Sequence, residues 1–143
     1  MDEFSKADYV WHVKRLSAND TLANHAHQAG PYIPKELLFR IFPSLNSPEK
    51  RNPDIRIRLV IDSHSDVRDA RVVWYNNKLF GNTRNEARMT NLGGAGSALL
   101  DPESTGALAV FCFYVDGNGE STTPDVHVWV CRDEIEEDYI EDL

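Results

Sequence analysis

The sequence predicts a mostly β protein with one or two short helices, arranged as an antiparallel barrel or sandwich. Five or six short segments are rich in β-branched and aromatic residues, the composition that favours strands. Turn-forming residues separate these segments, and strands do not alternate regularly with helices, so a doubly wound parallel sheet is not expected. At 143 residues the chain is expected to form a single domain, residues 1–143, with a core that needs no disulfide or metal.

The first third of the chain predicts a strand, a long polar loop and a short helix. Residues 9–16 are rich in aromatic and β-branched side chains and are expected to form a strand. Residues 17–30 are polar and too numerous for a tight connection, and such long loops are usually functional or disordered. A helix is predicted over residues 34–42, because Pro34 suits the first helical position and apolar residues follow at helical spacing.

The middle of the chain predicts strands and a second polar arm. Residues 55–61 alternate, with Arg56 and Arg58 on the face opposite the apolar residues, where a solvated face is the favoured interpretation. Residues 71–75 form another expected strand. Asn76-Asn77 is expected to be a two-residue hairpin turn that returns through residues 78–80. Residues 81–96 are polar and punctuated by glycines, and we expect a loop there.

The last third of the chain predicts a hairpin and an acidic end. Residues 107–115 are continuously apolar and indicate a buried strand. The turn-forming residues 116–119 connect it to a partner over residues 126–131. The acidic segment 133–143 is expected to be either a short helix or the disordered start of a linker. The tryptophans Trp11, Trp74 and Trp129 are expected in the core rather than on a stacking surface.

The charge of the chain is distributed unevenly. The net charge is −8, but residues 133–143 contribute seven acids and no Lys or Arg. Residues 50–88 carry nine basic and five acidic residues, which gives this segment a net charge of +4. The overall acidity therefore does not exclude a DNA-binding face.

Several function classes lack support in the sequence. The acidic N-terminus does not resemble a secretory signal, no apolar run is long enough to span a membrane, and a cytoplasmic location is expected. Cys112 and Cys131 lie in apolar segments and are expected to be buried and inert. The histidines lack zinc-ligand spacing, so no metal site is expected. A weak alternative is a small metal-dependent hydrolase centred on Asp54 and Asp62.

The two polar arms contain the residue types that recognise base edges in duplex DNA. Arg contacts guanine, Glu accepts from the cytosine amino group, and Asn or Gln pairs with adenine. Arg84, Glu86 and Arg88 form a dense group of this kind. The alternative is a solvated loop in which Arg84 or Arg88 forms an ion pair with Glu86, and composition alone favours that alternative.

Six sequence blocks in fixed order then indicate a family. They are KRLSANDT (14–21), HQAGPYIP (27–34), FPSLN (42–46), FGNTRNEARMT (80–90), DPESTGAL (101–108) and WVC (129–131). Together, over residues 9–138, they resemble the N-terminal effector domain of EcoRII-type, or type IIE, restriction endonucleases. The resemblance implies a B3-like DNA-binding pseudobarrel whose two arms embrace 5′-CCWGG in the major groove.

The resemblance also implies which residues contact DNA. The N-arm is residues 14–32 and the C-arm is residues 78–92. The contact candidates are Lys14, Arg15, Asn19, His27, Gln28, Tyr32, Lys78, Asn82, Arg84, Asn85, Glu86 and Arg88, with Arg84, Glu86 and Arg88 foremost. Compared with the family pattern, Asn82 and Ala87 replace lysines, Lys78 replaces an arginine and Leu92 replaces a tryptophan, which places affinity in doubt more than fold.

The resemblance covers only the specificity domain of such enzymes. We therefore expect a non-catalytic module that needs no cofactor to bind double-stranded DNA and is linked in the full-length prokaryotic enzyme to a nuclease domain, where Mg²⁺ would act. The rival hypothesis is a protein-interaction or DNA-mimic module that uses the acidic surface. Acids gathered on the face with the arms would favour the rival, and an acidic segment on the far side would favour DNA.

Overall fold

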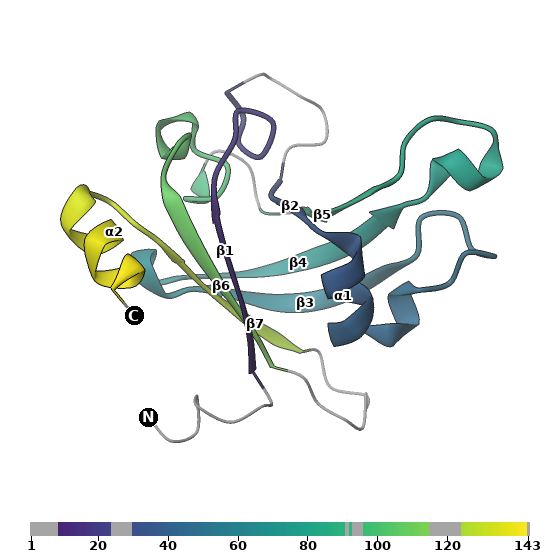
Figure 1. Ribbon diagram of the computed structural model, residues 1–143, viewed down its shortest axis with the longest axis horizontal. Helices are drawn as coiled ribbons and strands as arrows, with labels where there is room; N and C mark the ends of the chain where they lie inside the picture. The colour runs from purple at the N-terminus through teal and green to yellow at the C-terminus, as the bar shows by residue number, and fades with distance from the viewer. Residues whose placement is uncertain (1–8, 24–29, 91, 93–95, 115–123, 143) are drawn as a thin grey trace.

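A single seven-stranded sheet organises the protein (Figure 1). The computed structural model describes residues 9–23, 30–90, 92, 96–114 and 124–142. The strand order is β1-β6-β7-β3-β4-β5-β2, with β3 parallel to β7 and every other neighbouring pair antiparallel. The strands are β1 (Tyr9–Arg15), β2 (Tyr32–Ile33), β3 (Asp54–Ile61), β4 (Asp66–Tyr75), β5 (Glu86–Thr90), β6 (Leu108–Tyr114) and β7 (Asp125–Val130).

The sheet bends into an open half-barrel. Strands β1, β6 and β7 cross steeply past β3 and β4, and α1 (Lys35–Ile41) packs against the sheet (Figure 1). The second α-helix, α2 (Glu134–Glu141), lies at the opposite end of the molecule from the turn η3 (Asn77–Phe80) (Figure 1). The remaining short 3₁₀ turns are η1 (Pro43–Leu45), η2 (Asp62–His64) and η5 (Pro102–Ser104). The predicted class, a mostly β barrel-like fold with short helices, is therefore confirmed.

Local sequence signals account for both helices. Pro34 precedes α1 with a φ of −54°, close to the helical value, and Pro43 follows shortly after its end. Leu38 and Ile41 face the core. The first turn of α2 is capped by Asp133, whose carboxylate accepts a hydrogen bond from the backbone N–H of Glu136. Of the two alternatives for the acidic segment, the structure thus shows a helix over residues 134–141.

The core forms where alternating strands and α1 meet. Along β3, Ile57, Leu59 and Ile61 are buried, whereas Arg56 and Arg58 are exposed, as the alternation predicts. Strand β6 is buried from Leu108 to Phe113, which confirms the apolar run, and it pairs with β7 as the predicted hairpin. The predicted turn 116–119 lies outside the described residues. Among the described residues, no helix has the length and apolar character needed to cross a membrane.

The predicted hairpin at Asn76-Asn77 is wrong, and so is the assignment of residues 81–96 as loop throughout. Residues 77–80 form η3 instead. The strand that follows β4 in the chain and pairs with it is β5, which begins at Glu86. The alternation in β5 is weak in the sequence because one inward residue, Ala87, is small and lies between the charged Glu86 and Arg88, and the other is Met89. Both are nevertheless fully buried, and they fix the outward direction of Glu86 and Arg88.

Trp11 does not lie in the core, contrary to expectation. Its side chain is 54% exposed, whereas Trp74 is buried and Trp129 is partly buried. Trp11 occupies the outward phase of β1, together with Val13, because Val10 and Leu16 take the inward phase. Strand β1 is also an edge of the sheet.

Both cysteines are buried and unpaired, as predicted. Burial raises the pKa of the Cys112 thiol, and the nearby Asp62 carboxylate adds to this effect. Burial also raises the pKa of Cys131. Neither thiol is therefore primed as a nucleophile.

Candidate nucleic-acid interface

The two arms are joined to neighbouring strands of the sheet. Strand β2, where the N-arm ends, pairs with β5, which belongs to the C-arm. This pairing places Tyr32 opposite Arg88. The described parts of both arms project from the same side of the half-barrel, the top of Figure 1.

Arg84, Glu86 and Arg88 form a connected cluster on the outward face of the C-arm. Both Arg84 Nε, at 3.0 Å, and Arg88 Nε, at 3.1 Å, donate to the same Glu86 oxygen, Oε1. The Arg84 guanidinium also stacks over the Tyr75 ring, with its Cζ 3.7 Å from the ring centroid. The ion pairs that composition alone favoured are thus present, and they join the three side chains into one connected cluster.

The ion pairs leave recognition groups available. Among the described residues, Glu86 Oε2, Arg84 Nη1 and Arg88 Nη2 have no hydrogen-bonding partner. Burial alone would raise the pKa of Glu86, but hydrogen bonds and charge from Arg88 and Arg84 outweigh it and hold that pKa below its usual range. Glu86 is therefore an ionised acceptor flanked by two donors.

A buried carboxylate, Asp20, connects this cluster to the N-arm. Asp20 is 0% exposed. Its Oδ2 lies 2.6 Å from Lys14 Nζ, and its Oδ1 lies 3.2 Å from Arg88 Nη1. Burial would raise its pKa, but the hydrogen bonds from Lys14 and from the backbone N–H groups of Ser17 and Tyr32 keep the pKa low. Asp20 was not among the predicted site residues, because nothing local distinguishes it from other loop acids.

Tyr32 supplies an aromatic surface between the arms. Its residue is 39% exposed. Lys14 Nζ lies 5.5 Å from its ring centroid and Arg88 Cζ lies 6.0 Å from it. The backbone oxygen of Tyr32 also accepts from Lys14 Nζ at 3.0 Å. Lys14 is therefore held within the protein, with its side chain 16% exposed.

The start of the C-arm is fastened by two asparagines. Buried Asn76 accepts from the backbone N–H of Asn52 at 2.8 Å and donates to the backbone oxygen of Lys50 at 2.6 Å. Asn85, a predicted contact residue, accepts from the Trp74 indole N–H at 2.9 Å. Its carbonyl therefore has a structural partner already.

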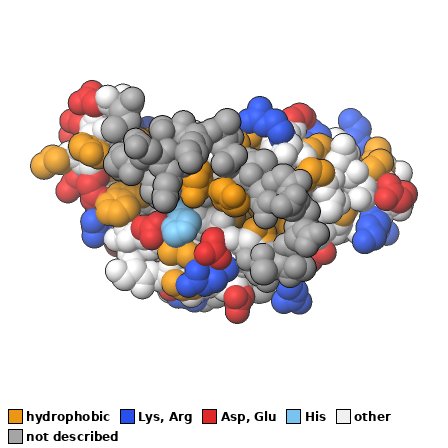
Figure 2. All heavy atoms as spheres, turned by 90° about the horizontal axis from the view of Figure 1, so that it is seen from below, with side chains coloured by type: hydrophobic (Ala, Val, Ile, Leu, Met, Phe, Trp, Pro, Cys, Tyr) orange, Lys and Arg blue, Asp and Glu red, His pale blue; other side chains and the backbone are white. Residues whose placement is uncertain are grey.

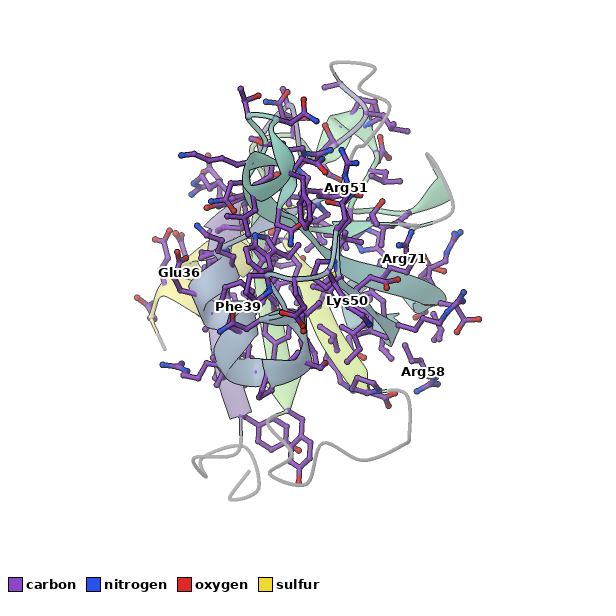
Figure 3. All side chains as sticks on the ribbon, turned by 90° about the vertical axis from the view of Figure 1, so that its right-hand side faces the viewer. Glu36, Phe39, Lys50, Arg51, Arg58 and Arg71 are labelled. Carbon is purple, nitrogen blue, oxygen red and sulfur yellow. The ribbon has the colours of Figure 1, made fainter. Side chains whose placement is uncertain are left out.

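Exposed cations lie near this start. Lys78 and Asn82 are exposed at the C-arm. The turn held by Asn76 adds two cations that were not predicted from the sequence, Lys50 and Arg51, and both lie on the side of the molecule that faces the viewer in Figure 3. Arg51 Nε donates to Asn77 Oδ1 at 3.1 Å, which places this cation next to η3.

The remaining predicted site residues differ in their positions. Arg15 lies away from the cluster, Asn19 contacts it, and His27 and Gln28 are not among the described residues. Arg15 faces α2, where it pairs with Glu137 and donates to the backbone oxygen of Gly106 at 3.0 Å. Asn19 contributes its backbone oxygen to Arg88 Nη1 at 3.3 Å. His27 and Gln28 lie outside the described residues.

Asp54 and Asp62, on which the metal-hydrolase alternative is centred, do not share a site. Asp54 begins β3 and Asp62 follows its end, so a strand length of roughly 25 Å separates them. Asp54 is paired with Arg71, and Asp62 is paired with His127. In the part of the chain that the structure describes, no group of three or more His, Cys, Asp or Glu side chains could hold a metal ion.

Fold and site together define a mostly β half-barrel domain with an arginine–glutamate cluster on and beside β5. The chain belongs to the family described as restriction endonuclease EcoRII, N-terminal, which matches residues 5–143. It is 39% identical over 141 residues to the type II restriction enzyme EcoRII of Escherichia coli, covering 97% of this chain and 34% of that protein. The chain thus spans about a third of its relative's length.

The chain also has a match among solved structures. The B3 domain of UbaLAI restriction endonuclease with cognate DNA matches with a TM-score of 0.47 and 19% sequence identity. The match covers 85% of this chain and 68% of that one.

Proposed function

We propose that this chain is the sequence-specific, double-stranded-DNA-binding effector domain of a restriction endonuclease. Its target would be 5′-CCWGG, bound in the major groove between the N-arm and the C-arm. The observation that carries the proposal is the cluster of Arg84, Glu86 and Arg88, in which one carboxylate orients two guanidinium groups on the outward face of β5. Membership of the EcoRII N-terminal family supports the same function.

The free groups of the cluster suit C·G base pairs. Glu86 Oε2 is proposed to accept from a cytosine N4 amino group. Arg84 Nη1 and Arg88 Nη2 are proposed to donate to guanine O6 or N7. Because Glu86 Oε1 already holds both Nε atoms, these side chains are oriented before DNA arrives, which lowers the entropic cost of recognition.

Phosphate contacts fall to the exposed cations. Lys78 has its side chain at the surface of the C-arm, and no side-chain partner for it is present among the described residues. Such contacts set the register of the protein on the duplex and make binding depend on salt. Lys14, Asn19, His27, Gln28, Tyr32, Asn82 and Asn85 remain proposed members of the interface, whereas Arg15, which pairs with Glu137 of α2, is no longer proposed as one.

In a full-length enzyme, this domain would bind an effector or target copy of the site and control a separate nuclease domain. That division would place catalysis and Mg²⁺ outside this chain, and DNA binding itself would need no cofactor. The relative's greater length is consistent with such an arrangement, because the matched region makes up only 34% of that protein.

The position of the acids favours DNA over the DNA-mimic alternative. The acidic helix α2 lies at the end of the molecule opposite η3, and acidic side chains gather at that end in the view from below (Figure 2). Elsewhere on that face, away from the arms, basic and acidic side chains are interspersed (Figure 2). The C-arm cluster thus does not share its surface with α2.

A gel-shift titration at two salt concentrations tests the proposal. It compares a CCWGG duplex with one that has a single outer base pair changed. We expect the wild type to prefer CCWGG by about tenfold or more, and Arg84→Ala to lose roughly 1–3 kcal/mol and relax discrimination at one base pair. Arg132→Ala, an equal charge change beside α2, is the matched control and should bind normally. Equal binding of both duplexes by the wild type would contradict sequence-specific recognition.

A further inference from the structure

We infer that Asp20 is a positioning residue that fastens the two arms together and aims Arg88, so that sequence discrimination depends on a carboxylate which itself does not touch DNA. This inference rests on the proposed function. It extends the interface inward from the partly buried cluster of Arg84, Glu86 and Arg88 to a fully buried group that connects three segments of the chain.

The contacts of Asp20 come from both sides of the fold. Lys14, at the end of β1, and Arg88, on β5, each approach one carboxylate oxygen, at 2.6 and 3.2 Å. The backbone N–H groups of Ser17 and Tyr32 donate to the same two oxygens, each at 2.9 Å. A single side chain thereby connects the start of the N-arm, its return into β2, and the C-arm strand.

The turn that presents Asp20 is itself closed by reciprocal hydrogen bonds. The backbone N–H of Ser17 donates to Asp20 Oδ2, and the backbone N–H of Asp20 donates to Ser17 Oγ at 3.2 Å. Together with complete burial, this places the carboxylate in one orientation. The described part of the N-arm is thus anchored at its base.

The hydrogen bonds that Arg88 donates show how Asp20 helps to orient its guanidinium group. Arg88 Nε donates to Glu86, and Nη1 donates to Asp20, to the backbone oxygen of Gly30 at 2.7 Å and to that of Asn19. Among the described residues, only Nη2 lacks a partner. The guanidinium is therefore held through Nε and Nη1, and its side chain is 11% exposed, so Nη2 is the group left to contact a base in one fixed geometry.

The charge of the enlarged cluster remains positive. Lys14, Arg84 and Arg88 contribute +3, and Asp20 and Glu86 contribute −2, which leaves +1. Replacing Asp20 with Asn would raise this sum to +2. A purely electrostatic contribution would then strengthen binding to every DNA, whereas loss of positioning would weaken binding to the cognate sequence in particular.

The test compares Asp20→Asn with the wild type on CCWGG and on a duplex with one changed outer base pair. We expect the ratio of the two affinities to fall roughly tenfold, while non-cognate binding stays equal or rises. In an Arg88→Met background, Asp20→Asn should change the ratio little, because its route of action is already absent. Leu59→Ala, a buried change in β3, is the control for lost stability and should keep the ratio.

The outcomes separate this inference from the proposed function. If the wild type does not discriminate, the proposed function fails. If the wild type discriminates and folded Asp20→Asn retains the full ratio, the positioning role is overturned while the proposed function stands. Should Asp20→Asn not fold, NMR of the wild-type Arg88 Nη–H groups decides, because Nη1 is the atom that donates to Asp20. We expect a slowly exchanging Arg88 signal without DNA, and a rapidly exchanging one would overturn the inference.

Discussion

Arg88 Nη1 lies 3.2 Å from Asp20 Oδ1, although the two residues are 68 positions apart in the chain. The sequence identified Arg88 as a leading candidate for contact with guanine. The structure adds that most of its donors are already engaged within the protein. The proposed binding surface is therefore organised before DNA is bound, and the following predictions test the consequences of that organisation.

The first prediction concerns stability and pH. The pKa values of Asp20 and Glu86 are both lowered in the folded protein. A lowered folded-state pKa stabilises the fold above the unfolded value, and this stability is lost as the pH falls through the folded-state pKa. Urea unfolding should therefore show a lower free energy of unfolding at about pH 3 than at neutral pH. Asp20→Asn should reduce this pH dependence. An unchanged pH dependence would contradict a lowered pKa for Asp20 in the folded protein.

The second prediction concerns the return of the N-arm at Gly30. Its φ is +145°, and a Cβ there would lie 1.9 Å from the backbone oxygen of Met89 in β5. Gly30→Ala must therefore displace the N-arm from the sheet. We expect the free energy of unfolding to fall by at least about 1–3 kcal/mol. Gly106→Ala is the matched control, because its φ is +90° but a Cβ there meets open space. Equal losses in urea titrations would show that backbone strain alone, rather than close contact, explains the effect.

The third prediction separates recognition from charge at the C-arm. Arg84→Lys keeps the positive charge but loses the planar group that stacks on Tyr75 and contacts Glu86. Discrimination between CCWGG and the changed duplex should fall, while the salt dependence of binding stays constant. Lys78→Ala should instead leave the discrimination unchanged. It should reduce the magnitude of the slope of log K against log salt by about 0.9. The same loss from both variants would mean that Arg84 contacts only phosphate.

The fourth prediction concerns Arg15, which the family resemblance placed among the DNA contacts. Its guanidinium pairs with Glu137 of α2 and donates to the backbone oxygen of Gly106. We therefore expect Arg15→Ala to leave the salt slope of DNA binding unchanged. A decrease of about 0.9 in the slope would instead show that Arg15 leaves α2 to contact a phosphate.

Parts of the fold were predictable because their signals are local. The alternation in β3 and the apolar run in β6 each report burial on one or both faces of a strand, and both predictions are confirmed. Strand β5 was missed because its inward positions include the small Ala87 between charged neighbours. Trp11 was misplaced because hydrophobicity does not reveal which phase of an edge strand faces the core.

The sequence by itself determined which recognition groups are available and how they are spaced. Arg84, Glu86 and Arg88 occur at intervals of two, the period of an extended chain, so any extended conformation directs them to one side. Only the tertiary structure decided how Arg88 is held. Its partners Asp20 and Gly30 lie 68 and 58 residues away, and the pairing of β2 with β5 brings them together. Local spacing follows from backbone geometry, whereas such contacts exist only after the chain has closed into the half-barrel.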